Sequence, residues 1–104
     1  MSMRTLPEIQ TLLMRGRFEF TRHAFKRAVE RNISEVEIRE AGEQLAIIED
    51  YPTDKYSPSC LVPGYTKGGR PLHLQVSLAD LDEVVIITLY EPDEAEWIEH
   101  RIRR

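Results

Sequence analysis

The sequence predicts an α+β domain in which helices pack on one face of a small antiparallel sheet. Helix-capping patterns lie in the first 44 residues, before any strand-like segment. Short segments rich in β-branched and apolar residues follow up to residue 90, separated by turn-forming residues. The last segment begins with Pro92 and acidic residues and ends with basic ones, which favours a final helix. We therefore expect three helices, about four strands and a C-terminal helix in a single domain over residues 1–104.

The three N-terminal helices are predicted from their first residues. A T-x-x-E capping box at residues 5–8 opens the first helix, which should end near Gly16. Thr21 can cap a second helix, because apolar residues follow it at helical spacing on one side. An S-x-x-E box at residues 34–37 opens a third helix, which should end near Gln44.

The strands are predicted from period-two patterns and turn residues. Residues 84–90 form the most apolar segment and are expected to be central, whereas Pro63 places its strand at an edge or a bulge. The glycine pair in KGGR suits a tight hairpin, ADLDE turns the chain, and RFEF (residues 17–20) is too short to assign. The four predicted strands are LAIIEDY (45–51), CLVPGYT (60–66), PLHLQVSL (71–78) and VVIITLY (84–90).

The charge is distributed unevenly along the chain. Residues 1–39 hold eight Lys or Arg against five Glu, a balance of +3, so residues 40–104 must carry −7 to give the total of −4. Within the first part, residues 15–31 hold six basic against two acidic residues, a local +4 that could attract phosphate. The N-terminal part is therefore the candidate surface for an anionic ligand.

Several classes of protein are excluded by composition. No apolar run approaches the roughly 18 residues that span a bilayer, and the N-terminus does not resemble a secretory signal, so we expect a cytoplasmic protein with no membrane partner. The single cysteine, Cys60, rules out an internal disulfide and a multi-cysteine zinc site. No H-x-x-x-H or H-E-x-x-H pair is present, so we expect no metal and no cofactor.

Candidate functional residues come from the second helix and two strands. At 100° per residue, His23, Arg27 and Arg31 lie along one side of the helix. Alternation places His73 on the less apolar face of its strand. In residues 84–90, alternation gives one face to Val85, Ile87 and Leu89 and the other to Val84, Ile86, Thr88 and Tyr90. If the polar sides coincide, these residues surround a small anionic substrate.

Such a group suits cleavage of RNA by attack of a ribose 2′-hydroxyl on the adjacent phosphate. That reaction needs a proton acceptor, a proton donor and a cation at the crowded phosphate, which His, Tyr and Arg can supply without a metal. The alternative is structural: Arg27 or Arg31 pairs with Glu30 or Glu35 on a solvated helix face, and His73 and Tyr90 are ordinary sheet residues. Trp97 is expected to pack the last helix onto the sheet and His100 to face water.

Four segments occur in the order typical of a small bacterial family: FTRHAFKRAVERNISEVEIREA, IIEDYP, PLHLQVSL and VVIITLYEPDEAEW. Over about residues 20–97 the chain resembles the domain of unknown function 4258 family, which is similar to the RelE/ParE-like toxins and to BrnT. The specific elements are H-x-x-x-R-x-x-x-R at residues 23–31, P-L-H at residues 71–73 and I-T-x-Y-x-P at residues 87–92.

The resemblance implies the toxin of a type II toxin–antitoxin pair, inhibited by a cognate antitoxin that in this family is often a short zinc-finger protein. It implies an endoribonuclease that acts on RNA or ribosome-bound mRNA. The fold that it implies consists of helices packed against a small antiparallel sheet. A non-catalytic module of the same fold that binds a protein or an RNA is the alternative. The implied catalytic residues are His23, Arg27, His73 and Tyr90, and the implied substrate-binding residues are Lys26, Arg31 and Thr88.

Overall fold

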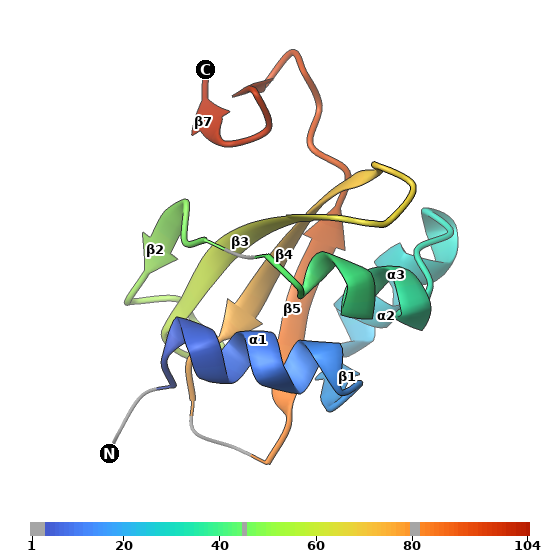
Figure 1. Cartoon of the computed structure of the whole chain (residues 1–104). Coiled ribbons are helices and arrows are strands. Elements are labelled where there is room, and N and C mark those ends of the chain that lie inside the picture. Colours follow the sequence, from blue (N-terminus) through green and yellow to red (C-terminus); the bar gives the residue numbers. More distant parts are fainter. Residues whose placement is uncertain (1–3, 45, 80–81) are drawn as a thin grey trace.

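Three helices and a five-stranded sheet make up an α+β fold in the computed structural model, which describes residues 4–44, 46–79 and 82–104 (Figure 1). The first residue of the first predicted strand, Leu45, and two residues of the predicted ADLDE turn, Asp80 and Leu81, lie outside this range. The helices are α1 (Leu6–Met14), α2 (Arg22–Glu30) and α3 (Glu35–Ala41). In spatial order the sheet contains β1 (Phe18–Phe20), β5 (Val84–Tyr90), β4 (Pro71–Ser77), β3 (Ser59–Tyr65) and β2 (Glu49–Tyr51).

The predicted caps start all three helices. Thr5 accepts a hydrogen bond from the backbone of Glu8, and Ser34 accepts one from Glu37, so both capping boxes are formed. Thr21 accepts from the backbone nitrogen of Ala24 at 3.0 Å. Each hydroxyl satisfies one of the backbone donors that the first turn of a helix leaves free.

The first two helices are followed by residues that adopt positive φ. Gly16, with φ of +74°, follows α1 as predicted. Asn32, with φ of +54°, follows α2, and the backbone nitrogen of Ile33 then reaches the carbonyl of Ala28 at 2.9 Å. Asparagine tolerates this conformation better than most residues do. The third helix ends at Ala41, a little earlier than predicted.

The four predicted strands are present as β2 to β5, each antiparallel to its sequence neighbour. The sheet also contains β1, from the RFEF segment that was too short to assign, and it lies parallel to β5 with Phe18 beside Val84. The prediction of a wholly antiparallel, four-stranded sheet was therefore wrong in this respect. This segment of three residues forms a strand because its pairing with β5 supplies the hydrogen bonds that stabilise it. A segment so short cannot be recognised as a strand from its own sequence.

One face of the sheet carries the core against the helices. Leu72, Leu74 and Val76 of β4 lie on this face with Ile9, Leu13 and Ile38 of the helices. Gly64 of β3 allows α3 to approach closely, since an added Cβ there would lie 2.3 Å from the carbonyl oxygen of Ala41. Cys60 is buried in the same core and has no disulfide partner.

A bulge in β5 changes which of its residues share a face. The pairing with β4 advances from Gln75–Thr88 to Val76–Ile86, so Ile87 is an extra residue. As a result Val84, Ile86 and Leu89 all belong to the core. The strict alternation predicted for residues 84–90 was wrong, because one inserted residue reverses the faces on either side of it.

The predicted C-terminal helix is absent from the described residues. Residues 93–97 form a turn in which Asp93 accepts hydrogen bonds from the backbone nitrogens of Ala95, Glu96 and Trp97. A small hairpin of β6 (Trp97–Ile98) and β7 (Ile102–Arg103) follows and stands over one end of the sheet (Figure 1). Burial of Trp97 against the sheet outweighs the helix-favouring charge pattern, which contributes only a fraction of a kcal/mol per residue.

Candidate functional site

Helix α2 is anchored to β5 at its first residue. Thr21, besides capping the helix, donates its hydroxyl hydrogen to the carbonyl oxygen of Ile87 at 3.0 Å. Ala24 and Ala28 pack into the core, which leaves the opposite side of the helix to solvent. The helix therefore lies beside the C-terminal half of β5, where the polar residues of that strand are.

The first predicted pair that the structure brings together is His23 and Thr88. The Nε2 atom of His23 lies 3.2 Å from the hydroxyl oxygen of Thr88, and the histidine is exposed. The β5 bulge places Thr88 on the same side of the sheet as Gln75, its partner on β4. A solvent-accessible imidazole held by a neighbouring hydroxyl is a suitable group for general acid or base catalysis.

The predicted arginines continue from His23 along α2. Arg27 makes only a long contact, 3.9 Å from Nη1 to a carboxylate oxygen of Glu30, with both side chains more than 40% exposed. Such a surface pair contributes little to stability, so it leaves the guanidinium available to a ligand. Arg31 and Lys26 are exposed as well. We call His23, Arg27 and Arg31 the α2 row.

Two further predicted residues, His73 and Tyr90, are in contact, with His73 fully buried and Tyr90 half-buried. Nε2 of His73 lies 2.5 Å from the carbonyl oxygen of His100, and Nδ1 lies 3.3 Å from the Tyr90 hydroxyl. A carbonyl only accepts, so Nε2 carries the proton and Tyr90 donates to Nδ1. Burial lowers the pKa of His73 and raises that of Tyr90, which keeps both groups neutral. Both ring nitrogens of His73 are thus occupied.

The C-terminal hairpin covers His73 completely. The Trp97 ring meets the His73 ring edge to face, with centroids 4.5 Å apart, and the two side chains are 2% and 0% exposed. The guanidinium of Arg103 lies over the Trp97 ring, 4.5 Å from its centroid, and forms a two-pronged ion pair with Glu49 at 2.8 and 2.9 Å. The sequence interpretation missed Arg103 and Glu49, because the segment was predicted to be a helix.

His100 differs from its prediction too. It was expected to face water, yet it is half-buried, and its Nδ1 lies 3.1 Å from the Tyr65 hydroxyl. Trp97 packs against the sheet as expected, although from a hairpin rather than a helix.

A hollow of about 390 Å³ lies between the end of the α2 row and Tyr90. Arg31 and Tyr90 line it together. Three carboxylates line it as well, Glu91, Asp93 and Glu96. The hollow is therefore acidic on balance, and an anion finds a more favourable field at the His23 and Arg27 end of the row.

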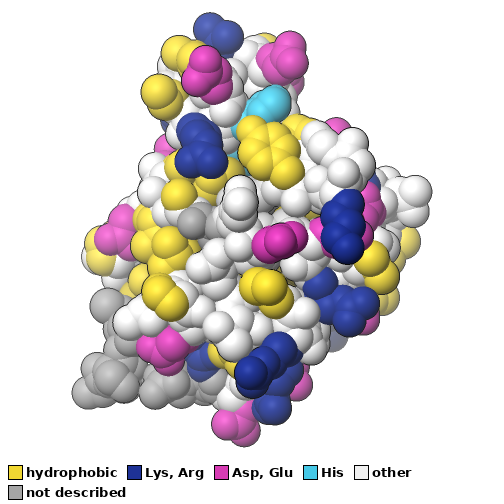
Figure 2. Space-filling model, viewed as in Figure 1, with side chains coloured by type: hydrophobic (Ala, Val, Ile, Leu, Met, Phe, Trp, Pro, Cys, Tyr) yellow, Lys and Arg dark blue, Asp and Glu magenta, His cyan; other side chains and the backbone are white. Residues whose placement is uncertain are grey.

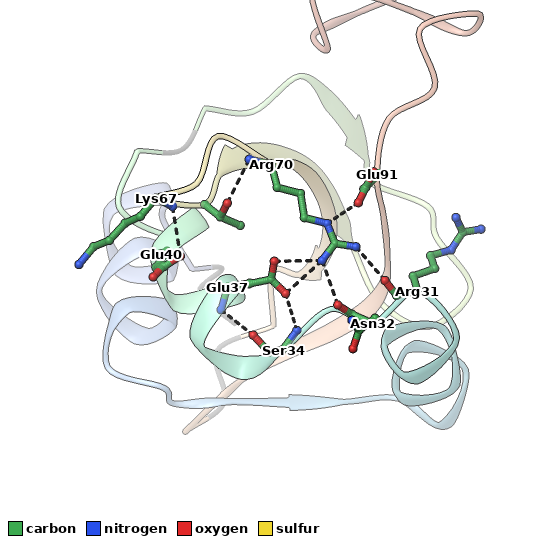
Figure 3. A network of polar contacts seen from close by, with 9 residues as sticks. Arg31, Asn32, Ser34, Glu37, Glu40, Lys67, Arg70 and Glu91 are labelled. Carbon is green, nitrogen blue, oxygen red and sulfur yellow. Dashed lines mark hydrogen bonds and ion pairs between the residues drawn. The ribbon is translucent and has the colours of Figure 1, made fainter.

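Arg70 holds the C-terminal end of the α2 row in place (Figure 3). Its guanidinium donates to the carbonyl oxygens of Arg31 at 2.7 Å and Asn32 at 2.9 Å, and it pairs with Glu37 at 3.0 Å and with Glu91. These contacts join the end of α2, the start of α3 and the end of β5. Sequence reasoning missed this residue, because KGGR was interpreted only as a turn.

One face of the molecule carries basic side chains that are dispersed rather than grouped. On the face that carries α1 and α3, Lys and Arg side chains alternate with acidic and apolar ones (Figure 2). The exposed basic residues of the +4 segment are Arg15, Arg17, Arg22, Lys26 and Arg31. Among the described residues, no three His, Cys, Asp or Glu side chains lie close enough to hold a metal ion, and no helix is long and apolar enough to cross a membrane.

Comparison with known proteins identifies the family. Residues 20–91 match the sequence model of the family described as "Domain of unknown function (DUF4258)", and the chain belongs to this family. No curated protein and no solved structure matches the chain. The match begins just before α2 and ends directly after β5, so it includes the α2 row, Arg70, His73 and Tyr90 but not the C-terminal hairpin.

Proposed function

We propose that this protein is the toxin of a type II toxin–antitoxin pair and that it cleaves RNA as a metal-independent endoribonuclease. The α2 row is the observation that carries the proposal: an exposed imidazole with a hydroxyl partner stands one helical turn from an arginine whose guanidinium is largely unengaged. The proposal also rests on the similarity of the family to RelE/ParE-like toxins and to BrnT that we expect from the sequence.

The proposed reaction needs few groups. His23 accepts the proton of a ribose 2′-hydroxyl, whose oxygen forms a bond to the adjacent phosphorus while the bond to the 5′-oxygen breaks. The product is a 2′,3′-cyclic phosphate. Arg27 and Arg31 stabilise the charge that builds on the phosphate oxygens, and Arg27 can bind two of them at once. The leaving 5′-oxygen takes its proton from water, because the Tyr90 hydroxyl already donates its hydrogen to Nδ1 of His73.

A non-catalytic RNA-binding module is the second candidate, and one observation favours it. His73 is fully buried and both of its ring nitrogens have partners, so a mechanism with two accessible histidines is not available in this conformation. The exposed cations of α2 would still bind phosphates electrostatically.

An antitoxin would find apolar surface on the other side of α2. Phe25 and Val29 are 60% and 65% exposed, and with Phe20 and Ile33 they line a hollow of about 330 Å³ between α2 and α3. Exposed apolar side chains grouped in this way favour binding of another protein.

The test is induced expression in a bacterial host at equal soluble levels, with growth and RNA integrity followed over time. Wild type is compared with His23→Ala, Arg27→Ala and Lys55→Ala, the last being an exposed residue far along the sequence from α2. Growth arrest with RNA cleavage in wild type and Lys55→Ala, but not in the two α2 variants, supports the nuclease. Intact RNA with wild type, together with binding of RNA by the purified protein, supports the binding module instead.

A further inference from the structure

The C-terminal segment, residues 93–103, lies beyond the residues that match the family model. The match ends at Glu91, and the next residues turn back over the sheet to cover His73. Trp97 supplies the covering ring, and the carbonyl oxygen of His100 occupies Nε2 of His73. A segment outside the matched residues thus removes one candidate catalytic residue from solvent.

An ion pair connects this segment to β2, the edge strand of the sheet at the far end from β1. Arg103 donates two hydrogen bonds to the carboxylate of Glu49 on β2, and its guanidinium stacks on Trp97. The Tyr51 hydroxyl donates to the same carboxylate. A planar, two-pronged contact of this kind defines one docked position, which a lone apolar contact does not.

The turn of the hairpin is held in an unfavourable conformation. Its two central residues, Glu99 and His100, have φ of +52° and +62°, a region where Asn and Gly are the usual residues. Residues held in this way persist only where the surrounding contacts maintain them. The turn nevertheless directs the His100 carbonyl oxygen at His73. The contact that covers the histidine is therefore made in spite of an unfavourable backbone conformation in the turn.

The same segment also changes the charge beside the α2 row. Asp93 and Glu96 line the hollow that Arg31 and Tyr90 share. The third carboxylate of that hollow, Glu91, is engaged by Arg70, whereas Asp93 and Glu96 form no ion pair with any of the described residues. Two free carboxylates there repel a phosphate that approaches Arg31.

We propose that residues 93–103 are an internal inhibitory cap, which buries His73 and holds two carboxylates beside Arg31 until it undocks. This proposal rests on the proposed action on RNA, because the cap is inhibitory only if the covered site acts there. Undocking frees Nε2 of His73 from the His100 carbonyl oxygen and withdraws Asp93 and Glu96 from the arginine.

The full-length chain itself offers the means to test the cap. Trp97 is the single tryptophan of the sequence, so its quenching by acrylamide reports docking directly. Reaction of neutral imidazole with diethyl pyrocarbonate, mapped by mass spectrometry, compares buried His73 with exposed His23 in one molecule. The variants are Arg103→Ala and Glu49→Gln, one from each side of the ion pair, and Arg101→Ala is the control because it removes the same charge from an exposed position of the same turn.

We expect Arg103→Ala and Glu49→Gln to increase the quenching of Trp97 several-fold, and to increase the modification of His73 several-fold relative to that of His23. Both should increase RNA cleavage by about tenfold. Arg101→Ala should resemble wild type in all three measurements. Unchanged quenching and modification in both variants would overturn the cap, whatever the RNA assay gives. Increased modification with unchanged cleavage by an active wild type would overturn its inhibitory role and leave the nuclease standing. Increased modification with no cleavage by any variant would refute the nuclease, and the inhibitory role with it.

Discussion

The guanidinium of Arg70 donates a hydrogen bond to the carbonyl oxygen of Arg31 at 2.7 Å, so a residue at the start of β4 fixes the end of α2. The last carbonyls of a helix have no partner within it, and a cation is favourable there. Arg70 also pairs with Glu37 and Glu91, so its positive charge partly offsets these two carboxylates. The position of the α2 row is therefore set by a residue outside it.

Arg70→Ala should destabilise the protein by about 2–4 kcal/mol, because it leaves two backbone carbonyls and two carboxylates without their donor. Arg70→Lys should recover only part of this loss, since an ammonium cannot reproduce the planar set of contacts. Urea unfolding measures both. The matched control is Arg39→Ala, an exposed arginine of α3, which should change stability by less than about 0.5 kcal/mol. An equally small effect of Arg70→Ala would show that solvent replaces these contacts without cost.

Gly64→Ala should cost more than about 3 kcal/mol, because the added Cβ would lie 2.3 Å from the carbonyl oxygen of Ala41 and α3 would have to move away from β3. Thermal unfolding measures the change. Gly68→Ala provides the control, because its nearest neighbour would be a hydroxyl oxygen at 3.8 Å. If both variants unfold at similar temperatures, the close approach of α3 to β3 is not required.

The salt dependence of RNA binding should report the α2 row. If Arg27 and Arg31 each neutralise one phosphate of a single strand, each change to Ala should reduce the slope of log K against log salt by about 0.7. Fluorescence anisotropy with a labelled oligonucleotide, titrated at several salt concentrations, gives the slope. Lys55→Ala, which removes an exposed charge in the loop between β2 and β3, should leave it unchanged. A reduction caused equally by Lys55→Ala would indicate binding to net charge rather than to the row.

Thr88→Val should reduce RNA cleavage by about tenfold, since valine keeps the shape of threonine but removes the hydroxyl 3.2 Å from Nε2 of His23. Because Thr88 positions the histidine, the loss should appear in kcat with little change in KM. Thr88→Ser keeps the hydroxyl and should retain most of the activity. Equal activity of the valine and serine variants would remove Thr88 from the mechanism.

Local sequence signals predicted the helix starts and the strands well. The capping boxes at Thr5 and Ser34 and the cap at Thr21 depend on residues within three positions, so the sequence contains the whole interaction. Errors arose where distant residues decide. The bulge at Ile87 becomes visible only when β5 is paired with β4, and the three residues of β1 form a strand only beside β5.

The candidate site was predicted in part for the same reason. Helical periodicity placed His23, Arg27 and Arg31 together, and the contact of His23 with Thr88 followed from two elements that lie side by side. Nothing local indicated that Trp97 and Arg103 would close over His73. Their segment has the proline, acidic and basic residues of a helix, and only burial against the sheet and the ion pair with Glu49 select the hairpin.

The ion pair between Arg103 and Glu49 should break at acidic pH, which should release the C-terminal hairpin from the sheet. The Arg103 hydrogen bonds lower the pKa of Glu49 to about 2, against an ordinary value near 4.5 for the unfolded chain. A carboxylate with a lowered pKa stabilises the docked state fully above about pH 4.5, and the contribution is lost as the pH falls towards 2. Its size should be about 1–2 kcal/mol, since the Glu49 side chain is still 24% exposed and solvent screens the pair.

Acrylamide quenching of Trp97 between pH 6 and pH 2 measures this opening, with circular dichroism as the control for global unfolding. Wild type should show a rise in quenching below about pH 4.5 that precedes the loss of secondary structure. Glu49→Gln should show high quenching already at pH 6 and no further rise that Glu49 could cause. His73, whose pKa is lowered by burial, disfavours docking below about pH 6.5 in both proteins, so the difference between their curves isolates Glu49. Identical curves would mean that the ion pair does not hold the hairpin on the sheet.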